Sequence, residues 1–293
     1  MRAAWYEKQG PANEVLIVGQ MPDPRPEAGE VRIRIAASGI NPGDIKKRQD
    51  SFGSGMPYPS VIPHSDGAGK VDLVGDGVSA EWIGRCGKCG GTARSPIDRS
   101  GRPQSLLLCR SIMSRHFPRM CRRRKALASE YPASPLTVPS TWGGDVRGRT
   151  VLVQGAGGAV VCVRSHFHDM VVCALWAQCA LRSEEPAART AGAHEVILNN
   201  QGLVERVKAL APEGVDHVVE VAFGANIDAD IEMLKMGGSI GAYATDNATP
   251  KIPFWLMVFK NIRVFFLGSD DFPVEAKVAA TRDLSKKARM PCS

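Results

Sequence analysis

Four consecutive residues, Gly155, Ala156, Gly157 and Gly158, could bind a phosphate group, and they follow directly on an apolar run. That run, Val151–Val153, has the composition of a buried parallel strand. Glycine permits left-handed backbone angles and lets the main chain approach a pyrophosphate, whose charge a helix N-terminus then stabilises. The pattern therefore predicts a dinucleotide-binding turn. A turn between a strand and a loop, with no ligand, is the alternative.

The chain downstream of this turn alternates between expected strands and expected helices. Strands are expected at Glu195–Leu198, Val215–Val221, Gly238–Ala244 and Asn261–Gly268, and helices at Glu185–His194, Gly202–Ala211 and Ile227–Met236. In the second of these helices, Leu203, Val207 and Leu210 fall on one side. The alternation predicts an α/β fold with a doubly wound parallel sheet, which binds ligands at the carboxyl ends of its strands.

The N-terminal part of the chain has the pattern of a small β-rich domain. Val31–Ile35 alternates apolar and polar residues with period two, as a half-buried strand does, after a Pro/Gly-rich turn at Pro22–Gly29. Ser38–Ile45 is expected to form a polar loop that ends in a helix cap at Asp44. This part of the chain therefore has a different architecture from the part after Thr150.

Three motifs in the β-rich part resemble one family. They are Ser38–Asp44 (Ser-Gly-Ile-Asn-Pro-Gly-Asp), Pro57–Pro59 (Pro-Tyr-Pro) and Ile62–Gly69 (Ile-Pro-His-Ser-Asp-Gly-Ala-Gly). With the Met-Arg-Ala opening, they are similar to the medium-chain dehydrogenase/reductase superfamily, specifically its zinc-independent, zeta-crystallin-like NADPH:quinone oxidoreductase branch. The resemblance implies a GroES-like catalytic domain beside a Rossmann domain, with hydride transfer from NADPH to a quinone or a similar electron-poor carbonyl compound.

The resemblance also implies roles for residues of the Rossmann domain. Gly155, Ala156, Gly157 and Gly158 would cradle the pyrophosphate, Val221, Ala222 and Phe223 would lie at the ribose-nicotinamide side, and Leu267 and Gly268 would lie beside the carboxamide. Core packing is an equally good explanation of the apolar positions. Arg182 and Ser183 stand where the second strand should end, and a cation with a hydroxyl suits the 2′-phosphate of NADPH. The adjacent Glu184 and Glu185 weaken this preference over NADH.

In the catalytic domain, the resemblance implies that Asn41 donates an amide hydrogen bond to the acceptor oxygen and that Tyr58 lines the same cleft. A loop-capping Asn and a packed aromatic residue are equally good explanations. Asn41 and Ser65 stand where zinc-dependent relatives have Cys and His ligands, so no catalytic zinc is expected.

Two segments have a composition that the rest of the chain does not share. They are Cys86–Thr141 and Val161–Leu181, and together with Cys292 they contain all eight cysteines. Arg85–Ser129 alone carries ten Arg and two Lys against one Asp; its charge of +11 leaves −4 for the rest of a chain whose total is +7. Cys86 and Cys89 form half of a zinc-knuckle pattern without a second half, and His166 and His168 lie inside the second segment, so no metal is expected.

The genetic code offers an explanation for both segments. Reading their codons in a shifted frame, with the degenerate third bases left open, permits sequences that resemble the family's missing elements. We therefore interpret both segments as frame-shifted, against the alternative of an insertion with its own structure. The chain end after 272 is expected to be a truncated return to the catalytic domain. The expected domains are 1–142 (catalytic), 143–272 (Rossmann) and 273–293.

Three functions from different classes follow. The first is an NADPH-dependent quinone oxidoreductase, and the second is a defective family copy with weak or no activity. A polyanion-binding protein that uses Arg115–Lys125 is a distant third, because this run lacks interleaved aromatic residues. No nucleic acid or membrane partner is expected, and no long apolar run or leader-like start is present, so a cytoplasmic location is expected. The resemblance implies a homodimer formed through the sheet edge near Arg263–Leu267.

Overall fold

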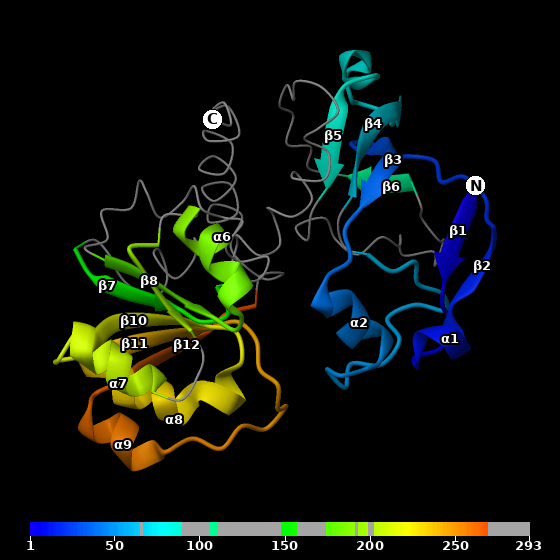
Figure 1. The fold of residues 1–293 in the computed structure, drawn as a ribbon. Helices are drawn as coiled ribbons and strands as arrows, with labels where there is room; N and C mark the ends of the chain where they lie inside the picture. Colours follow the sequence, from blue (N-terminus) through cyan, green and yellow to red (C-terminus); the bar gives the residue numbers. More distant parts are fainter. Residues whose placement is uncertain are drawn as a thin grey trace. The chain divides into compact units, whose positions relative to one another are not determined.

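The computed structural model describes residues 1–64, 67–89, 106–109, 148–156, 174–190, 193–198 and 202–268. The chain divides into two compact units, Met1–Tyr131 and Pro132–Ser293 (Figure 1). The domain bounds predicted near residues 142 and 272 fall outside the described ranges and stay predictions.

The N-terminal unit is built from antiparallel strands. The larger sheet has the order β5-β4-β3-β6, and the smaller pairs β1 with β2. The strands are β1 (Arg2–Trp5), β2 (Ile17–Gln20), β3 (Val31–Ser38), β4 (Gly67–Val74), β5 (Cys86–Cys89) and β6 (Leu106–Cys109), with α1 (Ala12–Val15), α2 (Pro42–Arg48) and η1 (Ala80–Trp82). The period-two alternation in β3 has its predicted effect, because Val31 and Ile33 are buried together with Val71 of β4.

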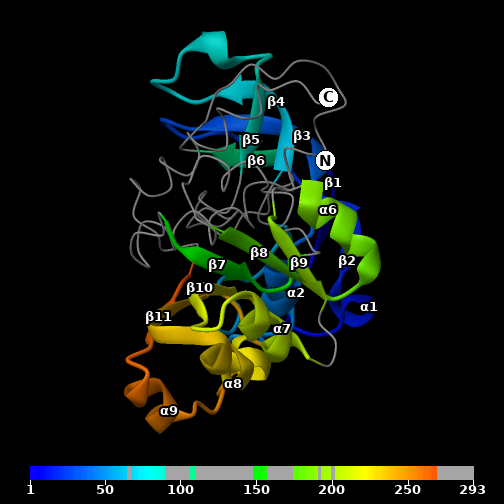
Figure 2. The same ribbon diagram turned by 60° about the vertical axis from the view of Figure 1, so that its left-hand side comes forward.

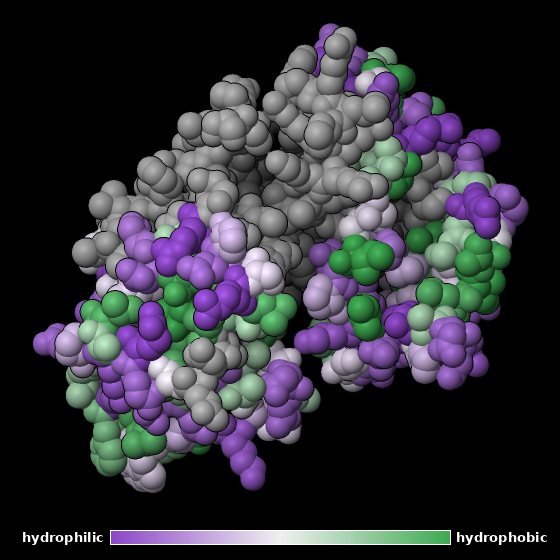
Figure 3. Space-filling view, in the orientation of Figure 1, coloured by the Kyte–Doolittle hydropathy of each residue, from purple (hydrophilic) through white to green (hydrophobic). Residues whose placement is uncertain are grey.

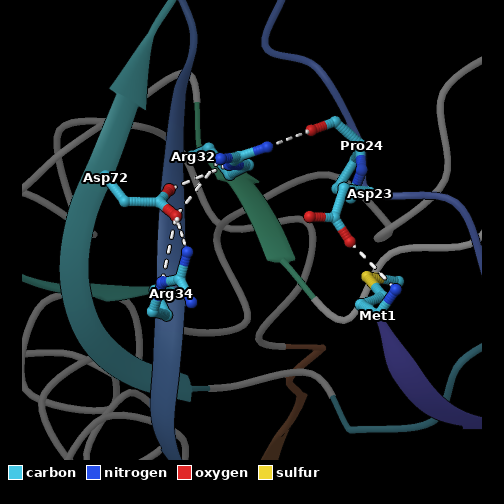
Figure 4. A network of polar contacts seen from close by, with 6 residues as sticks. All are labelled: Met1, Asp23, Pro24, Arg32, Arg34 and Asp72. Carbon is cyan, nitrogen blue, oxygen red and sulfur yellow. Dashed lines mark hydrogen bonds and ion pairs between the residues drawn. The ribbon is translucent and has the colours of Figure 1, made fainter.

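A polar network joins the two middle strands of the larger sheet (Figure 4). The Arg32 guanidinium donates to both carboxylate oxygens of Asp72 across the sheet, at 2.8 and 3.2 Å, and also to the Pro24 carbonyl at 3.0 Å. Arg34 donates to the same carboxylate at 3.2 Å. Because the first pair is bidentate and largely buried, it fixes the pairing of β3 with β4 more firmly than an exposed ion pair would.

The second unit contains one six-stranded sheet in which all the strand pairs are parallel. Its order is β12-β11-β10-β7-β8-β9. The strands are β7 (Thr150–Val153), β8 (Ala174–Cys179), β9 (Glu195–Leu198), β10 (Val215–Glu220), β11 (Leu234–Ala242) and β12 (Arg263–Phe266). The strand order reverses between β7 and β10, which is the switch point where doubly wound folds bind dinucleotides. The predicted parallel sheet is confirmed.

Helices cover both faces of this sheet, as Figure 2 shows. The helices are η4 (Arg182–Glu184), α6 (Glu185–Thr190), α7 (Leu203–Leu210), α8 (Phe223–Met233) and α9 (Phe254–Phe259). On one face, Ala188 of α6 packs with Val153 and Val219. On the other face, Val207 of α7 and Ile227 of α8 pack with residues that include Leu152 and Val218. Alternating strand residues therefore enter two separate cores, which is why the strands are apolar on both sides.

Several expected element bounds shift in the structure. The second strand, β8, ends at Cys179, three residues before the expected Arg182. Helix α8 begins at Phe223 instead of Ile227, and α2 begins at Pro42 with Asn41 as its N-cap, so Asp44 lies in the first turn and is not the N-cap. Leu210 of α7 is 44% exposed, so the expected apolar side of that helix is only partly buried.

The second segment of unusual composition supplies a core strand. Its residues Trp176, Ala177, Gln178 and Cys179 in β8 are all buried. An unusual composition of the segment as a whole therefore does not prevent residues 176–179 from forming an interior strand, because a short apolar run suits that position whatever its origin. Two stretches of the first segment also pair in the larger N-terminal sheet as β5 and β6.

None of the helices in the described part of the chain has the length and apolarity that a bilayer span requires. The cytoplasmic location stays a prediction.

Candidate functional site

The first described residue of the glycine turn has the backbone geometry that only glycine adopts easily. Gly155 has a φ of +65°. A Cβ at this position would lie 2.8 Å from Cγ1 of Val221, which follows β10. Gly155 is therefore required both by its backbone angle and by the close approach of the two chain segments that flank the switch point.

Gln178, near the end of β8, anchors this turn. Its side-chain carbonyl accepts a hydrogen bond from the Gly155 N–H at 2.8 Å, and its backbone carbonyl accepts one from the Ala156 N–H at 2.7 Å. Gln178 is 4% exposed, so both bonds are shielded from water. The turn after β7 is consequently fixed to its neighbouring strand before any ligand binds.

The turn after β10 is fixed by Glu220, the last residue of that strand. The Glu220 carboxylate accepts hydrogen bonds from the Ala222 backbone N–H and from the Asn226 side-chain amide, which contacts both oxygens at 3.1 and 3.2 Å. The predicted residues Val221 and Ala222 are half-buried and lie in this turn. Their backbone position thus depends on a buried carboxylate directly before them.

A second buried acid, Asp230 of α8, lies beneath the same turns. Its Oδ1 accepts a hydrogen bond from the side-chain amide of Gln154 at 2.8 Å, and Gln154 directly precedes Gly155. Burial raises the pKa of Asp230 well above its usual value, and the negative charge of Glu220 and the hydrogen bond to it raise this pKa further. The hydrogen bond from Gln154 acts in the opposite direction.

The apolar residues predicted for the site lie at the carboxyl edge of the sheet. Phe223 is buried in the core, and its ring contacts that of Phe266 edge to face, with 5.3 Å between centroids. Leu267 is half-buried after β12 and donates its N–H to the Ala242 carbonyl at 2.9 Å, whereas Gly268 is exposed. For Phe223, the structure thus shows the packing role that was the alternative to a cofactor contact.

Arg182 and Ser183 are exposed in the turn that follows β8. The acids beside them make local contacts. The Glu184 carboxylate accepts the Leu181 N–H at 3.0 Å, and Glu185 pairs with Arg189 at 2.9 Å. The two carboxylates that weaken the preference for a 2′-phosphate are therefore engaged within their own turn and helix.

In the N-terminal unit, Asn41 and Tyr58 lie in ordered surroundings. Asn41 is the N-cap of α2, and its backbone N–H donates to the Asp44 carboxylate at 2.8 Å. Tyr58 packs against the buried cluster of Tyr6, Val15 and Val61. Both alternatives to a catalytic role, a capping Asn and a packed aromatic, are thus present in the structure.

A contact in this unit links two of the motifs on which the resemblance depends. Ser38 Oγ lies 2.8 Å from Nδ1 of His64, and His64 has a φ of +84°. A non-glycine residue rarely adopts such an angle, so this contact helps to hold His64 in that conformation.

Other predicted residues lie outside the described ranges. They are Gly157, Gly158, Val161, Ser65, His166 and His168, with most of the two segments of unusual composition and the expected return after residue 272. Among the described residues, no group of three or more His, Cys, Asp or Glu side chains could hold a metal ion. The backbone of Cys86–Cys89 is extended in β5.

The sequence did not point to the buried polar residues of the site, which are Gln154, Gln178, Glu220 and Asp230. A usable signal was present for two of them. Gln154 directly follows the apolar run Val151–Val153, and Glu220 ends the buried strand Val215–Glu220. A polar residue at the last position of a buried parallel strand lies at the ligand-binding edge.

The sequence matches two domain families. Residues 27–100 match the alcohol dehydrogenase GroES-like domain, and residues 179–280 match the zinc-binding dehydrogenase family. The two matches fall in the β-rich unit and in the parallel-sheet unit, so the predicted combination of GroES-like and Rossmann folds is confirmed.

Similar proteins of known name include quinone oxidoreductases. The chain is 28% identical to the quinone oxidoreductase of Rattus norvegicus over 225 residues, which covers 74% of this chain and 65% of the relative. It is 26% identical to the synaptic vesicle membrane protein VAT-1 homolog of Homo sapiens, covering 76% of this chain and 56% of the relative. The chain thus spans about two thirds or less of the length of these relatives.

Solved structures show the same fold. The Escherichia coli quinone oxidoreductase complexed with NADPH has a TM-score of 0.78 at 18% identity, over 98% of this chain and 88% of that chain. A mycobacterial protein complexed with NADPH has a TM-score of 0.78 at 19% identity, over 100% of this chain and 91% of that chain. The chain thus contains the two domains that the resemblance to medium-chain dehydrogenases/reductases implies, and it is similar to quinone oxidoreductases over about three quarters of its length.

Proposed function

We propose that this chain is an NADPH-dependent oxidoreductase that transfers a hydride to a quinone or a similar electron-poor carbonyl compound without zinc. The observation that carries the proposal is the position of Gly155, which has left-handed backbone angles at the switch point between β7 and β10. The quinone oxidoreductase relatives and the NADPH complexes of structural neighbours support the substrate and the cofactor.

The residues present fit a dinucleotide. The turn after β7 has a glycine where the backbone must take a left-handed angle, and the turn after β10 is held by Glu220. When bound, the nicotinamide supplies the hydride, while the protein orients it and excludes competing reactions. In this proposal, Gly155–Gly158 hold the pyrophosphate and Val221, Ala222, Leu267 and Gly268 border the nicotinamide end.

NADPH is favoured over NADH by the turn after β8. Arg182 and Ser183 are exposed there, and Glu184 and Glu185 bind within their own segment. A guanidinium binds a phosphate with charge-assisted hydrogen bonds. Arg182→Glu should therefore lower the affinity for NADPH relative to NADH, and equal preference in the variant and the wild type would contradict the assignment.

The acceptor would be oriented by the N-terminal unit. Asn41 is proposed to donate an amide hydrogen bond to the acceptor oxygen, and Tyr58 to line the same cleft. A donor aimed at the oxygen stabilises the charge that develops there as hydride arrives. Asn41→Ala should lower kcat more than it raises KM, because such a bond is stronger in the transition state than in the ground state.

Zinc independence is proposed because Asn41 and Ser65 stand where zinc ligands would be needed. Because residues 179–280 match a family described as zinc-binding dehydrogenase, zinc independence needs a direct test. Dialysis against a chelator should leave the rate of NADPH oxidation unchanged, whereas a loss that added zinc restores would contradict the proposal.

The direct test of the function is NADPH oxidation with a quinone acceptor, followed by the loss of NADPH absorbance. We expect turnover above the rate without protein, and its loss in Gly155→Ala. No turnover above background would favour the defective family copy, in which the fold is kept without the activity.

A homodimer is proposed through the edge of the parallel sheet. Strand β12 pairs only with β11 among the described strands, and exposed apolar residues lie on and near it, with Phe266 70% exposed and Trp255 and Phe259 of α9 at 65% and 69%. Figure 3 shows part of this hydrophobic surface over α9. Sedimentation should give a dimer that Phe266→Glu dissociates, and a wild-type monomer at high concentration would contradict this proposal.

A further inference from the structure

Two carboxyl groups lie side by side under the switch point, and both are fully buried. Glu220 ends β10 and Asp230 belongs to α8, and each has a relative exposure of 0%. Asn226, whose side-chain amide contacts both oxygens of Glu220, lies one helical turn before Asp230 on α8, so both carboxyl groups are held at the same face of this helix. Two adjacent carboxylates without a counter-ion repel each other strongly at low dielectric, so one of them must be neutral.

The hydrogen-bond donors around the pair show which group carries the charge. Glu220 receives the Ala222 backbone N–H and the Asn226 amide, which contacts both of its oxygens. Asp230 receives a single donor, from Gln154, on Oδ1. Its Oδ2 has no hydrogen-bond partner among the described residues and is shielded from solvent.

We propose that Asp230 is protonated in the folded protein and donates its hydroxyl hydrogen to the ionised Glu220, so that one proton ties α8 to the ends of β7 and β10. This arrangement gives Oδ2 of Asp230 a role as a donor and adds a third donor to Glu220. Every polar atom of the pair then has a partner, as buried polar groups require.

The surrounding groups agree with a neutral Asp230. Burial raises its pKa, as does Glu220, and none of the groups that act on this carboxyl in the described part of the chain is a cation. Tyr243, which follows β11, faces Glu220, and burial together with this charge raises the pKa of its hydroxyl. Helix α7, which packs on α8, places Lys208 against Glu232, and Lys260, which follows α9, donates to a backbone carbonyl near the end of α8.

The pair is connected to both turns of the site. Gln154, which directly precedes Gly155, donates to Asp230, and Glu220 accepts the N–H of Ala222, which directly follows Val221. Gly155 and Val221 are the residues that approach each other across the switch point. Asp230 is therefore a positioning residue for the dinucleotide turns. This positioning role rests on the proposed function, whereas the protonation of Asp230 does not.

The proton itself is tested without NADPH by denaturant unfolding of the full chain at several pH values. Between the ordinary pKa of an unfolded Asp and the raised pKa of the folded one, the folded chain holds one more proton than the unfolded chain. In this pH range the unfolding constant rises tenfold for each unit of increasing pH. The wild type should show this slope, and Asp230→Asn should remove it, because the Asn amide donates an N–H to Glu220 and does not titrate. Asp228→Asn, at an exposed acid of the same helix, is the control and should keep the wild-type slope.

Two further measurements keep the test decisive if Asp230→Asn folds poorly. Glu220→Gln should narrow the pH range of the slope, because it removes the negative charge that raises the pKa of Asp230 while the burial of Asp230 remains. The infrared spectrum of the wild type at neutral pH should contain the carbonyl band of a protonated carboxyl group that Asp230→Asn lacks. An equal slope in the wild type and both variants, or no such band, would overturn the proposal.

The positioning role is tested by NADPH titration. Asp230→Ala should raise the dissociation constant on the order of tenfold, because Glu220 loses a buried donor, whereas Asp230→Asn should restore wild-type affinity. Equal affinity of the Ala variant and the wild type would contradict the positioning role. A wild type that binds no NADPH would instead overturn the proposed function, and the pH slopes would still decide whether the proton is shared.

Discussion

The side-chain carbonyl of Gln178 accepts a hydrogen bond from the backbone N–H of Gly155 at 2.8 Å. This contact joins the glycine turn to a strand that lies within a segment of unusual composition. The segment thus contributes to the predicted cofactor site through a glutamine, a residue type that sequence patterns do not associate with a dinucleotide-binding turn.

Gln178→Ala should weaken the site and the fold together. The change removes the buried acceptor of the Gly155 N–H, and an unsatisfied buried donor costs about 1–3 kcal/mol. We expect a lower free energy of unfolding and a larger dissociation constant for NADPH. The exposed Gln20 of β2 provides the control, since Gln20→Ala should change neither quantity.

Gly155→Ala should be more destabilising than Gly148→Ala. Both glycines have nearly the same φ, +65° and +68°, so Ala at either position is strained by about 1 kcal/mol. At Gly155 the new Cβ meets Val221 at 2.8 Å, whereas at Gly148 no atom of the described residues lies within 4 Å of it. Denaturant unfolding should show an additional loss of about 1–3 kcal/mol at Gly155. Equal losses would mean that the two turns do not approach as closely as described.

His217 should make the second unit sensitive to acid. It is 1% exposed, its Nδ1 lies 2.8 Å from Oγ of Ser239, and burial together with the charges of Arg149 and Arg263 lowers its pKa to about 4. Because the unfolded chain binds the proton first, stability is lost as the pH falls from about 6.5 towards about 4, by up to about 3 kcal/mol.

His217→Asn should remove this acid-dependent part of the unfolding free energy. The exposed His194 is the control, and His194→Asn should leave the loss in place. If the two variants have the same pH profile between about pH 4 and pH 6.5, His217 is not the source of the effect.

Lys260 should stabilise the end of helix α8. Its ammonium group donates to the carbonyls of Ile231 and Leu234 at 2.7 and 2.9 Å. A cation at a helix C-terminus satisfies carbonyls that lack partners in the helix. Lys260→Met should lower the midpoint of thermal unfolding and cost about 1–2 kcal/mol, whereas Lys251→Met, at an exposed lysine in the preceding loop, should be neutral. An unchanged midpoint for Lys260→Met would show that water replaces these bonds without cost.

Hydrophobic patterning predicts two strands of the second unit well, because their burial is a property of each local run, whereas β11 begins at Leu234, within the expected helix Ile227–Met236. Strand β9 has the predicted bounds, Glu195–Leu198, and β10 ends one residue early at Glu220. The proline of Asn41-Pro42 was a usable signal for the start of α2, since proline is favoured at the first helical position.

The features that sequence patterns missed depend on contacts between distant residues. Helix α8 begins at Phe223 without a capping side chain of its own. Its first N–H groups bind instead to the Ala244 carbonyl and to Oγ1 of Thr245, about 20 residues further along the chain. Likewise Gln154 and Asp230 are separated by 76 residues, so their hydrogen bond follows only from the assembled sheet and helix.

The claim that the switch point binds a dinucleotide is tested most directly by calorimetric titration of the full chain with NADPH. We predict saturable binding at one site for the wild type and for Gly148→Ala, and its loss in Gly155→Ala. No saturable binding by the wild type, or unchanged binding by Gly155→Ala, would contradict the account.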